Sequence, residues 1–75
     1  NISIEYCNEW NYLPRAASMA NKLLEKYGNS ITNFSLTPSG GGVYEVEKNG
    51  KLIFSKKSLD RFPELDEIIA LIDEK

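Results

Sequence analysis

The sequence has no histidine, and Cys7 is its single cysteine among 75 residues. One cysteine cannot form a disulfide within the chain, so the disulfide-stapled secreted class is excluded and a reducing, cytoplasmic compartment is expected. Without histidine, the usual general base and the commonest transition-metal ligand are missing. We therefore expect no histidine-based hydrolase or zinc site, and no metal or resident cofactor.

Long apolar runs and an excess of positive charge are missing as well. The longest apolar stretches are far shorter than the roughly 20 residues needed to cross a bilayer, and no segment has the pattern of a signal peptide. Lys and Arg number 9 against 11 for Asp and Glu, which gives a net charge of -2. We expect neither a membrane nor nucleic acid as a partner. The chain starts at Asn1 rather than methionine, so we expect that a few leading residues have been removed.

Apolar periodicity predicts where the first strand and the first helix lie. Residues 1–6 alternate between polar and apolar, which predicts a strand with Ile2 and Ile4 on one face. From Leu13 the apolar spacing becomes helical, and we expect a helix up to Tyr27. The apolar stripe of this helix consists of Leu13, Ala16, Ala17, Ala20, Leu23, Leu24 and Tyr27.

Turn-forming residues mark the ends of this helix. Asn11 is the predicted N-cap, and Gly28 supplies the left-handed stop. Pro14 suits a first turn because its missing N–H needs no partner there.

A second extended run covers 31–36. A helix between two strands predicts a right-handed unit with parallel strands.

A hairpin and a second helix complete the pattern. Asn49-Gly50 lies between extended runs at 43–47 and 52–55, and it predicts antiparallel strands because both central positions of a type I′ turn need positive φ. After Pro63, apolar residues return at helical spacing, with acidic residues in the first turn, where the helix dipole favours them. The apolar positions are Leu65, Ile68, Ile69 and Ile72, and the acidic ones are Glu64, Asp66 and Glu67.

The element order β-α-β-β-β-α predicts one domain of the α/β (α+β) class over residues 1–75. A mixed four-stranded sheet covered by two helices satisfies this order. A chain of this length buries only about 60% of the surface that it exposes when unfolded, so nearly every apolar residue has to contribute to the core. Lys56-Lys57 is interpreted as a solvated loop after the last strand, with a docking patch as the alternative.

Cys7 directly follows the first strand and precedes the helix by only a few residues. We expect its sulfur near the exposed N–H groups at the helix start, a position that favours the thiolate. Glu9 places a negative charge nearby and partly opposes this effect. The alternative is that Cys7 is a small buried hydrophobe, which is where free cysteines are most often found. Its position alone does not separate the two.

Several segments of the chain stand in a characteristic order and spacing. They are Glu5-Tyr6-Cys7-Asn8-Glu9-Trp10-Asn11-Tyr12-Leu13-Pro14-Arg15-Ala16-Ala17, the glycine-rich turn into Val43-Tyr44-Glu45-Val46, Gly50-Lys51-Leu52-Ile53-Phe54-Ser55-Lys56-Lys57, and Phe62-Pro63-Glu64. Along the whole chain they resemble the selenoprotein W-like (Rdx) family of thioredoxin-fold proteins. The resemblance implies a thioredoxin-like fold with a Cys-x-x-selenocysteine or Cys-x-x-Cys pair. It also implies thiol redox chemistry with protein thiols and disulfides, or glutathione, as the partner.

Within this resemblance Cys7 aligns with the first member of the pair, and the second falls on Trp10. Indole can neither attack a disulfide nor close one with Cys7, so the two-thiol cycle is unavailable as written. We favour the explanation that position 10 belongs to selenocysteine, whose codon UGA is read as tryptophan by some genetic codes and suppressing hosts. This explanation includes a protein whose selenocysteine codon was deliberately recoded so that the chain could be made without selenium. The other explanation is a natural single-thiol paralogue in which Trp10 packs over the site.

The favoured function is a thiol redox protein in which Cys7 attacks, or is captured by, a partner disulfide or oxidised glutathione. Only this first half-step can run with Trp10 in the second position. The alternative is a non-catalytic thioredoxin-fold interaction module that uses the aromatic and glycine surface around position 10 to bind another protein.

Further features are expected near this site. In a thioredoxin-like fold the Ser39–Gly42 run lies beside the turn after Cys7 and lines a groove for a partner's sulfur. A phosphate-binding loop is disfavoured, because this run precedes a strand and not a helix. The Thr37-Pro38 bond is near the usual cis-proline of that fold, and its isomer is left open. Four aromatic residues either form a rim around the cysteine or fill the core, and Tyr6 is assigned to the core. The four are Tyr6, Trp10, Tyr12 and Phe62.

Overall fold

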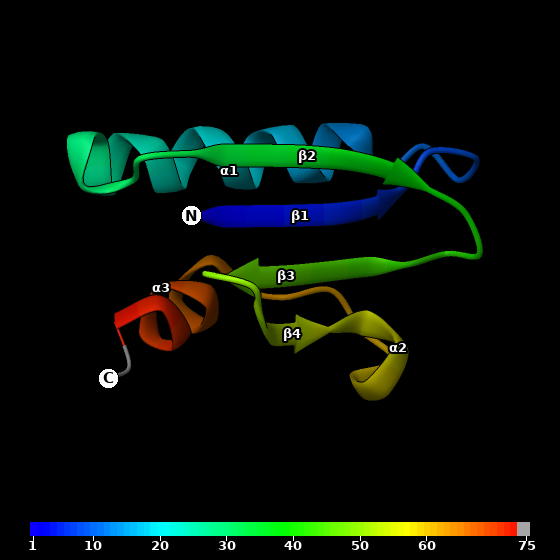
Figure 1. The fold of residues 1–75 in the computed structure, drawn as a ribbon. Helices are drawn as coiled ribbons and strands as arrows, with labels where there is room; N and C mark the ends of the chain where they lie inside the picture. The colour runs from blue at the N-terminus through cyan, green and yellow to red at the C-terminus, as the bar shows by residue number, and fades with distance from the viewer. Residues whose placement is uncertain (74–75) are drawn as a thin grey trace.

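The computed structural model describes residues 1–73, and Figure 1 shows how their strands and helices are arranged. The strands are β1 (Ile2–Cys7), β2 (Phe34–Ser39), β3 (Tyr44–Lys48) and β4 (Lys51–Ser55). The helices are α1 (Leu13–Tyr27), α2 (Lys56–Leu59) and α3 (Leu65–Asp73), with a short 3-10 helix η1 (Gly28–Ser30) after α1. The predicted order β-α-β-β-β-α is confirmed, and η1 and α2 are additions to it.

The four strands form one mixed sheet in the order β2-β1-β3-β4. β1 pairs in parallel with β2 and antiparallel with β3, and β3 pairs antiparallel with β4. The β3–β4 turn has φ +53 at Asn49 and +82 at Gly50, as the predicted type I′ hairpin requires. β1 and β3 are therefore central, and β2 and β4 are the edges. No helix within residues 1–73 is long and apolar enough to cross a membrane.

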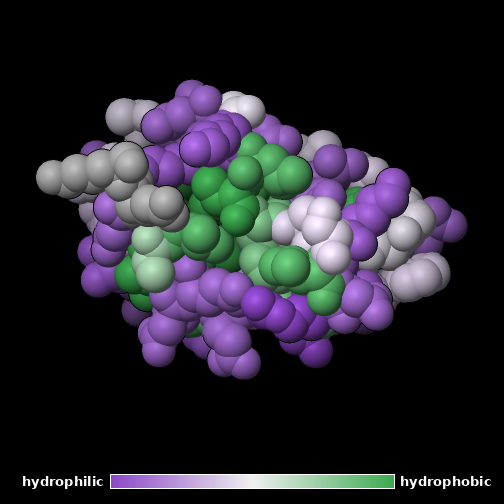
Figure 2. All heavy atoms as spheres, turned by 90° about the horizontal axis from the view of Figure 1, so that it is seen from below, coloured by the Kyte–Doolittle hydropathy of each residue, from purple (hydrophilic) through white to green (hydrophobic). Residues whose placement is uncertain are grey.

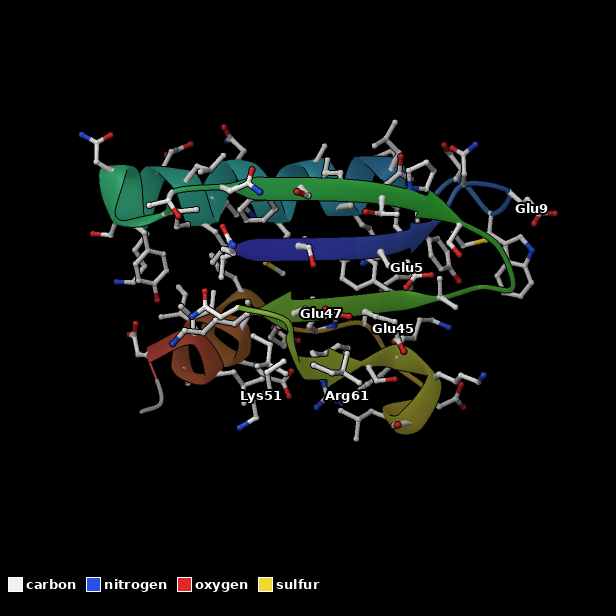
Figure 3. All side chains as sticks on the ribbon, viewed as in Figure 1. Glu5, Glu9, Glu45, Glu47, Lys51 and Arg61 are labelled. Carbon is white, nitrogen blue, oxygen red and sulfur yellow. The ribbon has the colours of Figure 1, made fainter. Side chains whose placement is uncertain are left out.

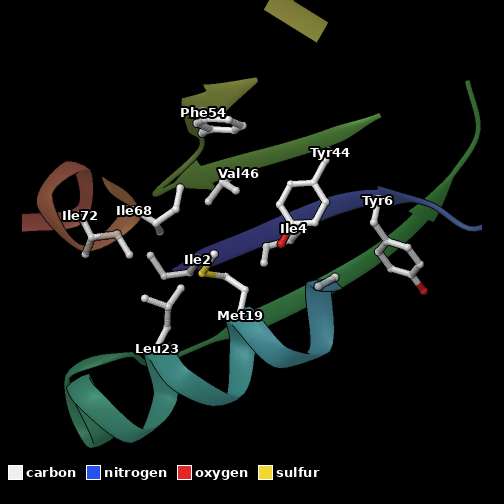
Figure 4. Close-up of a cluster of buried hydrophobic side chains, with 11 residues drawn as sticks. Ile2, Ile4, Tyr6, Met19, Leu23, Tyr44, Val46, Phe54, Ile68 and Ile72 are labelled. Atoms are coloured by element: carbon white, nitrogen blue, oxygen red, sulfur yellow. The ribbon is translucent and has the colours of Figure 1, made fainter. Parts of the chain in front are cut away.

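Both long helices cover the same face of the sheet, and the core lies between the two layers (Figures 1 and 4). Alternation along β1 turns Ile2, Ile4 and Tyr6 toward this core. The predicted stripe of α1 is shifted, because Met19 is buried whereas Leu13 and Leu24 are each 42% exposed. The other buried members of the core are Ala16, Leu23, Tyr44, Val46, Phe54, Ile68 and Ile72.

The opposite face of the sheet is open and carries the polar half of each strand. Glu5 of β1 lies directly across from Glu45 of β3, and Glu47 follows on the same face (Figure 3). Ser55 Oγ donates a hydrogen bond of 2.8 Å to Glu45 Oε1, while Glu45 Oε2 is buried without a hydrogen-bond partner among residues 1–73. At the β4 edge, apolar side chains gather over β4 and α3 (Figure 2), and Leu52 is 50% exposed.

The start of α1 differs from the prediction. Asn11 has φ +59 and lies in the turn before the helix, so it is not the N-cap; Tyr12 takes that place and its side chain makes no capping hydrogen bond. The short polar side chain of asparagine tolerates left-handed backbone better than most residues do, which explains its position here. Pro14 lies in the first turn, as predicted. Gly28 ends the helix with a φ of +54, but its ψ of -126 places it outside the predicted left-handed helical region.

Two other segments also differ from the sequence-based expectation. β2 spans Phe34–Ser39 rather than 31–36, and as an edge strand it accommodates Pro38, whose missing N–H needs no partner there. The Thr37-Pro38 bond is trans. Lys56-Lys57 begins the one-turn helix α2 rather than a solvated loop, because Ser55 Oγ caps it by accepting the Ser58 N–H at 3.2 Å.

Candidate functional site

Cys7 is the last residue of β1, and both of its backbone groups are hydrogen-bonded. Its N–H donates to the Val43 carbonyl at 2.9 Å, and its carbonyl accepts the Tyr12 N–H at 3.1 Å. The residue pairs with Ser39 of β2 and is completely buried, with 0% of its surface exposed. This burial is typical of a structural free cysteine. The thiol therefore reacts with a partner in solution only after the segments that cover it move aside.

That turn, residues 8–11, is tied to the end of β2. The Asn8 N–H donates to the Ser39 carbonyl at 2.9 Å, and the Asn11 N–H donates back to the Asn8 carbonyl at 3.3 Å. Trp10, the second position of the predicted pair, is 61% exposed. Glu9 extends from the same turn into solvent (Figure 3). The turn thus places the indole at the surface, whereas the neighbouring Cys7 is buried.

The glycine-rich connection between β2 and β3 packs directly against this turn. A Cβ built on Gly42 would lie 2.5 Å from Trp10 Cζ3, and one built on Gly40 would lie 2.5 Å from Glu9 Oε1. Gly42 also has φ +74, which residues with a side chain rarely adopt. The expectation that this loop lies beside the Cys7 turn is confirmed. The Glu9 carboxylate at Gly40 further disfavours a phosphate there.

The exposed indole begins a row of aromatic rings along one side of the molecule. Trp10 meets Tyr12 edge to face at 6.1 Å between ring centroids, Tyr12 meets Phe62 at 4.8 Å, and Phe62 meets Tyr44 at 5.4 Å. Tyr6 is 6% exposed and belongs to the core, as predicted. Three of the four candidate rim residues are therefore in contact at the surface, and Tyr44 extends the row inward.

Sequence reasoning missed the two cations that stack on this row. Arg15 Cζ lies 4.0 Å from the centroid of the Phe62 ring. Lys56 Nζ lies 5.4 Å from the Phe62 centroid and 5.7 Å from that of Tyr12. Arg15 stands three residues after Tyr12, an offset that puts both on one helix face, and this was the available signal. No sequence signal placed Lys56 near these rings, because its position depends on helix α2, which was not predicted.

Tyr44 lies at the buried end of the row. Burial raises the pKa of Tyr44 to about 12, although the positive charge of Arg15 acts in the opposite direction. The phenol therefore stays neutral to a higher pH than that of an ordinary tyrosine. Within residues 1–73, no group of three or more His, Cys, Asp or Glu side chains is arranged to hold a metal ion.

Comparison with known proteins gives matches over almost the whole chain. The model of the Rdx family matches residues 1–74. Selenoprotein W of the zebrafish Danio rerio is 35% identical over 66 residues, which are 87% of this chain and 77% of that protein.

Two solved structures share the fold. A crystal structure of a Bordetella parapertussis protein has a TM-score of 0.91 at 32% identity, covering 95% of this chain and 90% of the other. A selenoprotein W-related protein from Vibrio cholerae has a TM-score of 0.90 at 31% identity, covering 95% and 89%. The mixed sheet and its covering helices are thus the architecture of selenoprotein W-related proteins.

Proposed function

The chain belongs to the Rdx family, and on this basis we propose that it is a thiol redox protein in which Cys7 is the reacting group. The observation that carries the proposal is the position of Cys7 at the end of β1, followed by a turn whose position 10 reaches the surface. That spacing is the one expected for the family's redox pair. We place the chemistry in the cytoplasm, whose reducing thiol pools keep a lone cysteine free.

The reaction proposed for Cys7 is thiol–disulfide exchange. The Cys7 thiolate attacks one sulfur of a protein disulfide or of oxidised glutathione, and a new bond to that sulfur forms. The old sulfur–sulfur bond breaks, and its electron pair leaves with the other sulfur, which takes a proton from solvent. The product is a mixed disulfide on Cys7. In the family pattern the residue at position 10 then resolves it, whereas Trp10 leaves release to an external thiol.

We further propose that position 10 is the site of selenocysteine in the native protein. Support comes from the family resemblance, in which the second redox position falls on Trp10, and from the 35% identity to selenoprotein W of Danio rerio. The codon in the native gene provides the direct test. UGA at this position supports the proposal, and UGG contradicts it.

Mass spectrometry of the folded protein tests the thiol reaction. After incubation with oxidised glutathione, one adduct is expected on the unmodified chain and none on Cys7→Ser. Trp10→Cys is expected to form an intramolecular disulfide with Cys7, detected as protection from alkylation until a reductant is added. Trp10→Ala is the matched control, because it removes the indole without adding a thiol. A Cys7 that stays unreactive in all folded variants contradicts the proposal.

A second function, a non-catalytic interaction module, is favoured by a specific observation. The thiol is completely buried while Trp10 is 61% exposed, so the surface offered to a partner is aromatic rather than sulfur-bearing. Under this alternative, the affinity for a protein partner survives Cys7→Ser and falls with Trp10→Ala. Under the redox proposal, trapping of a partner disulfide is lost with Cys7→Ser.

A further inference from the structure

A surface groove of about 590 Å³ lies between α1 and the segment that leads into α3. Its floor is apolar: Met19 is 9% exposed and Tyr44 is 1% exposed, and the half-buried Phe62 and Leu65 complete it. Its walls consist of side chains that are themselves exposed to solvent. A groove that is apolar at the bottom and open at the top suits a side chain presented by another chain better than an enclosed small molecule.

Arg15 stands at the edge of this groove. Its guanidinium lies over the Phe62 ring, 4.0 Å from the centroid, which holds the group in place without occupying its N–H edges. No ion pair or side-chain hydrogen bond involves Arg15 within residues 1–73. A planar guanidinium held in this way binds a carboxylate with two parallel hydrogen bonds.

A second cation lines the same groove at a defined distance. Lys22 follows Arg15 by seven residues, two turns of α1, so the two stand on one helix face roughly 10 Å apart along the axis. Two carboxylates three residues apart in a chain with the polyproline II conformation lie on the same side of the chain and about 9 Å apart, because that conformation has three residues per turn. One of the two residues between them then turns toward the apolar floor.

The charge around the groove differs from that of the whole protein. The lining carries two positive charges, those of Arg15 and Lys22, against the one negative charge of Glu64, and Lys56 lies outside the lining beside the Phe62 ring. The chain as a whole carries a net charge of -2. A positive, apolar-floored groove on an acidic protein is complementary to an acidic segment with an apolar centre and repels a basic one.

We propose that this groove binds an acidic segment of another protein, with an apolar side chain seated on the Phe62 side of the floor. One carboxylate of the segment pairs with Arg15 and a second pairs with Lys22. This goes beyond the proposed redox function, because binding requires no reaction at Cys7. The aromatic row from Phe62 to Trp10 joins the groove to the Cys7 turn, so a docked partner lies next to that turn.

Titration of the isotopically labelled protein with the peptide acetyl-Gly-Glu-Leu-Phe-Glu-Gly-amide, followed by amide chemical shifts, tests the proposal. Saturable shifts are expected at Arg15, Ser18, Lys22 and Leu65, which surround the groove. The affinity is expected to fall with added salt, since exposed charge pairs are screened. A peptide with lysine for both glutamates, and one with serine for the leucine and phenylalanine, are expected to bind at least tenfold more weakly.

Substitutions in α1 complete the test. Arg15→Gln is expected to weaken binding at least tenfold. Arg15→Lys is expected to weaken it less, because lysine keeps the positive charge but cannot donate two parallel hydrogen bonds to one carboxylate. Lys26→Gln, on the same helix but outside the groove lining, is the matched control and is expected to leave the affinity unchanged. Dispersed amide spectra verify that each variant is folded. Cys7→Ser is expected to bind normally, which separates this proposal from the redox function.

Three outcomes would overturn the groove proposal. They are the absence of saturable shifts, equal binding of the basic peptide, and an unchanged affinity in folded Arg15→Gln. Shifts at the groove caused by glutathione but not by the acidic peptide would make it a small-molecule site and would equally contradict a protein partner.

Discussion

Gly42→Ala gives the sharpest test of how the turn after Cys7 is held closed. The added Cβ would stand 2.5 Å from Trp10 Cζ3, far inside contact distance, and the backbone there has φ +74. The indole therefore has to leave its place against the loop. We expect this to loosen the 8–11 turn and to increase access to the buried thiol of Cys7.

The neighbouring glycine provides a matched control for the backbone contribution. Gly41 has φ +73, and a Cβ there meets nothing within 4 Å. Gly41→Ala is expected to lower the free energy of unfolding by about 1–2 kcal/mol from left-handed strain alone. Gly42→Ala carries the same strain and also disturbs the edge-to-face contact of Trp10 with Tyr12, for a further loss of about 1 kcal/mol.

Urea unfolding and thiol labelling measure the two effects separately. Trp10 is the only tryptophan, so its emission reports directly on the turn, and a red shift is expected for Gly42→Ala but not for Gly41→Ala. The rate at which Cys7 reacts with a disulfide reagent is expected to rise only in Gly42→Ala. When Trp10 is also replaced by alanine, Gly41→Ala and Gly42→Ala are expected to lower the free energy of unfolding by the same amount. Equal emission and equal labelling rates in the two single variants would refute the reasoning.

Three other substitutions test contacts elsewhere in the fold. The pKa of Tyr44 is raised from 10.0 to about 12, so the stability that this residue contributes is complete below pH 10 and is lost as the pH rises toward 12. Tyr44→Phe is expected to flatten this decline of the free energy of unfolding with pH. An unchanged slope would contradict the prediction. Glu45→Gln is expected to raise the free energy of unfolding in urea by several tenths of a kcal/mol, since it removes the like charge facing Glu5, and a lowered free energy of unfolding would argue against repulsion. Gly50→Ala, at φ +82, is expected to cost about 1–2 kcal/mol, measured by thermal unfolding; a neutral result would show that the hairpin readily adopts another turn.

The fold was largely predictable because its main elements carry strong local signals. The alternation of β1 and the Asn49-Gly50 turn each specify their structure without help from distant residues. The errors lie where tertiary contacts decide. Met19 replaces Leu13 and Leu24 in the core because the sheet, rather than the helix alone, determines which side of α1 is covered.

The candidate site was predictable in its backbone but not in its side-chain environment. Cys7 was singled out by its position between the first strand and the first helix, and Trp10 was identified through the family resemblance. The position of the glycine loop beside them followed from the expected topology. The burial of Cys7 depends on how the 8–11 turn packs on residues some 30 positions later, which no local pattern encodes. The stacking of Lys56 on Phe62 likewise depends on the helix α2, whose Ser55 cap was not recognised.

Trp10 and Gly42 are linked by size, and this link bears on the chemistry proposed for Cys7. The indole fills the space that a side chain at position 42 would occupy. A cysteine or selenocysteine at position 10 is much smaller and leaves that space open beside the turn. The same loop conformation thus accommodates a bulky side chain at position 10, which fills this space, and a small side chain, which leaves it open. Replacing Trp10 by cysteine therefore does two things at once, because it supplies a resolving thiol and clears an approach for a partner's sulfur. Comparison with Trp10→Ala, which only clears the approach, separates access from resolution.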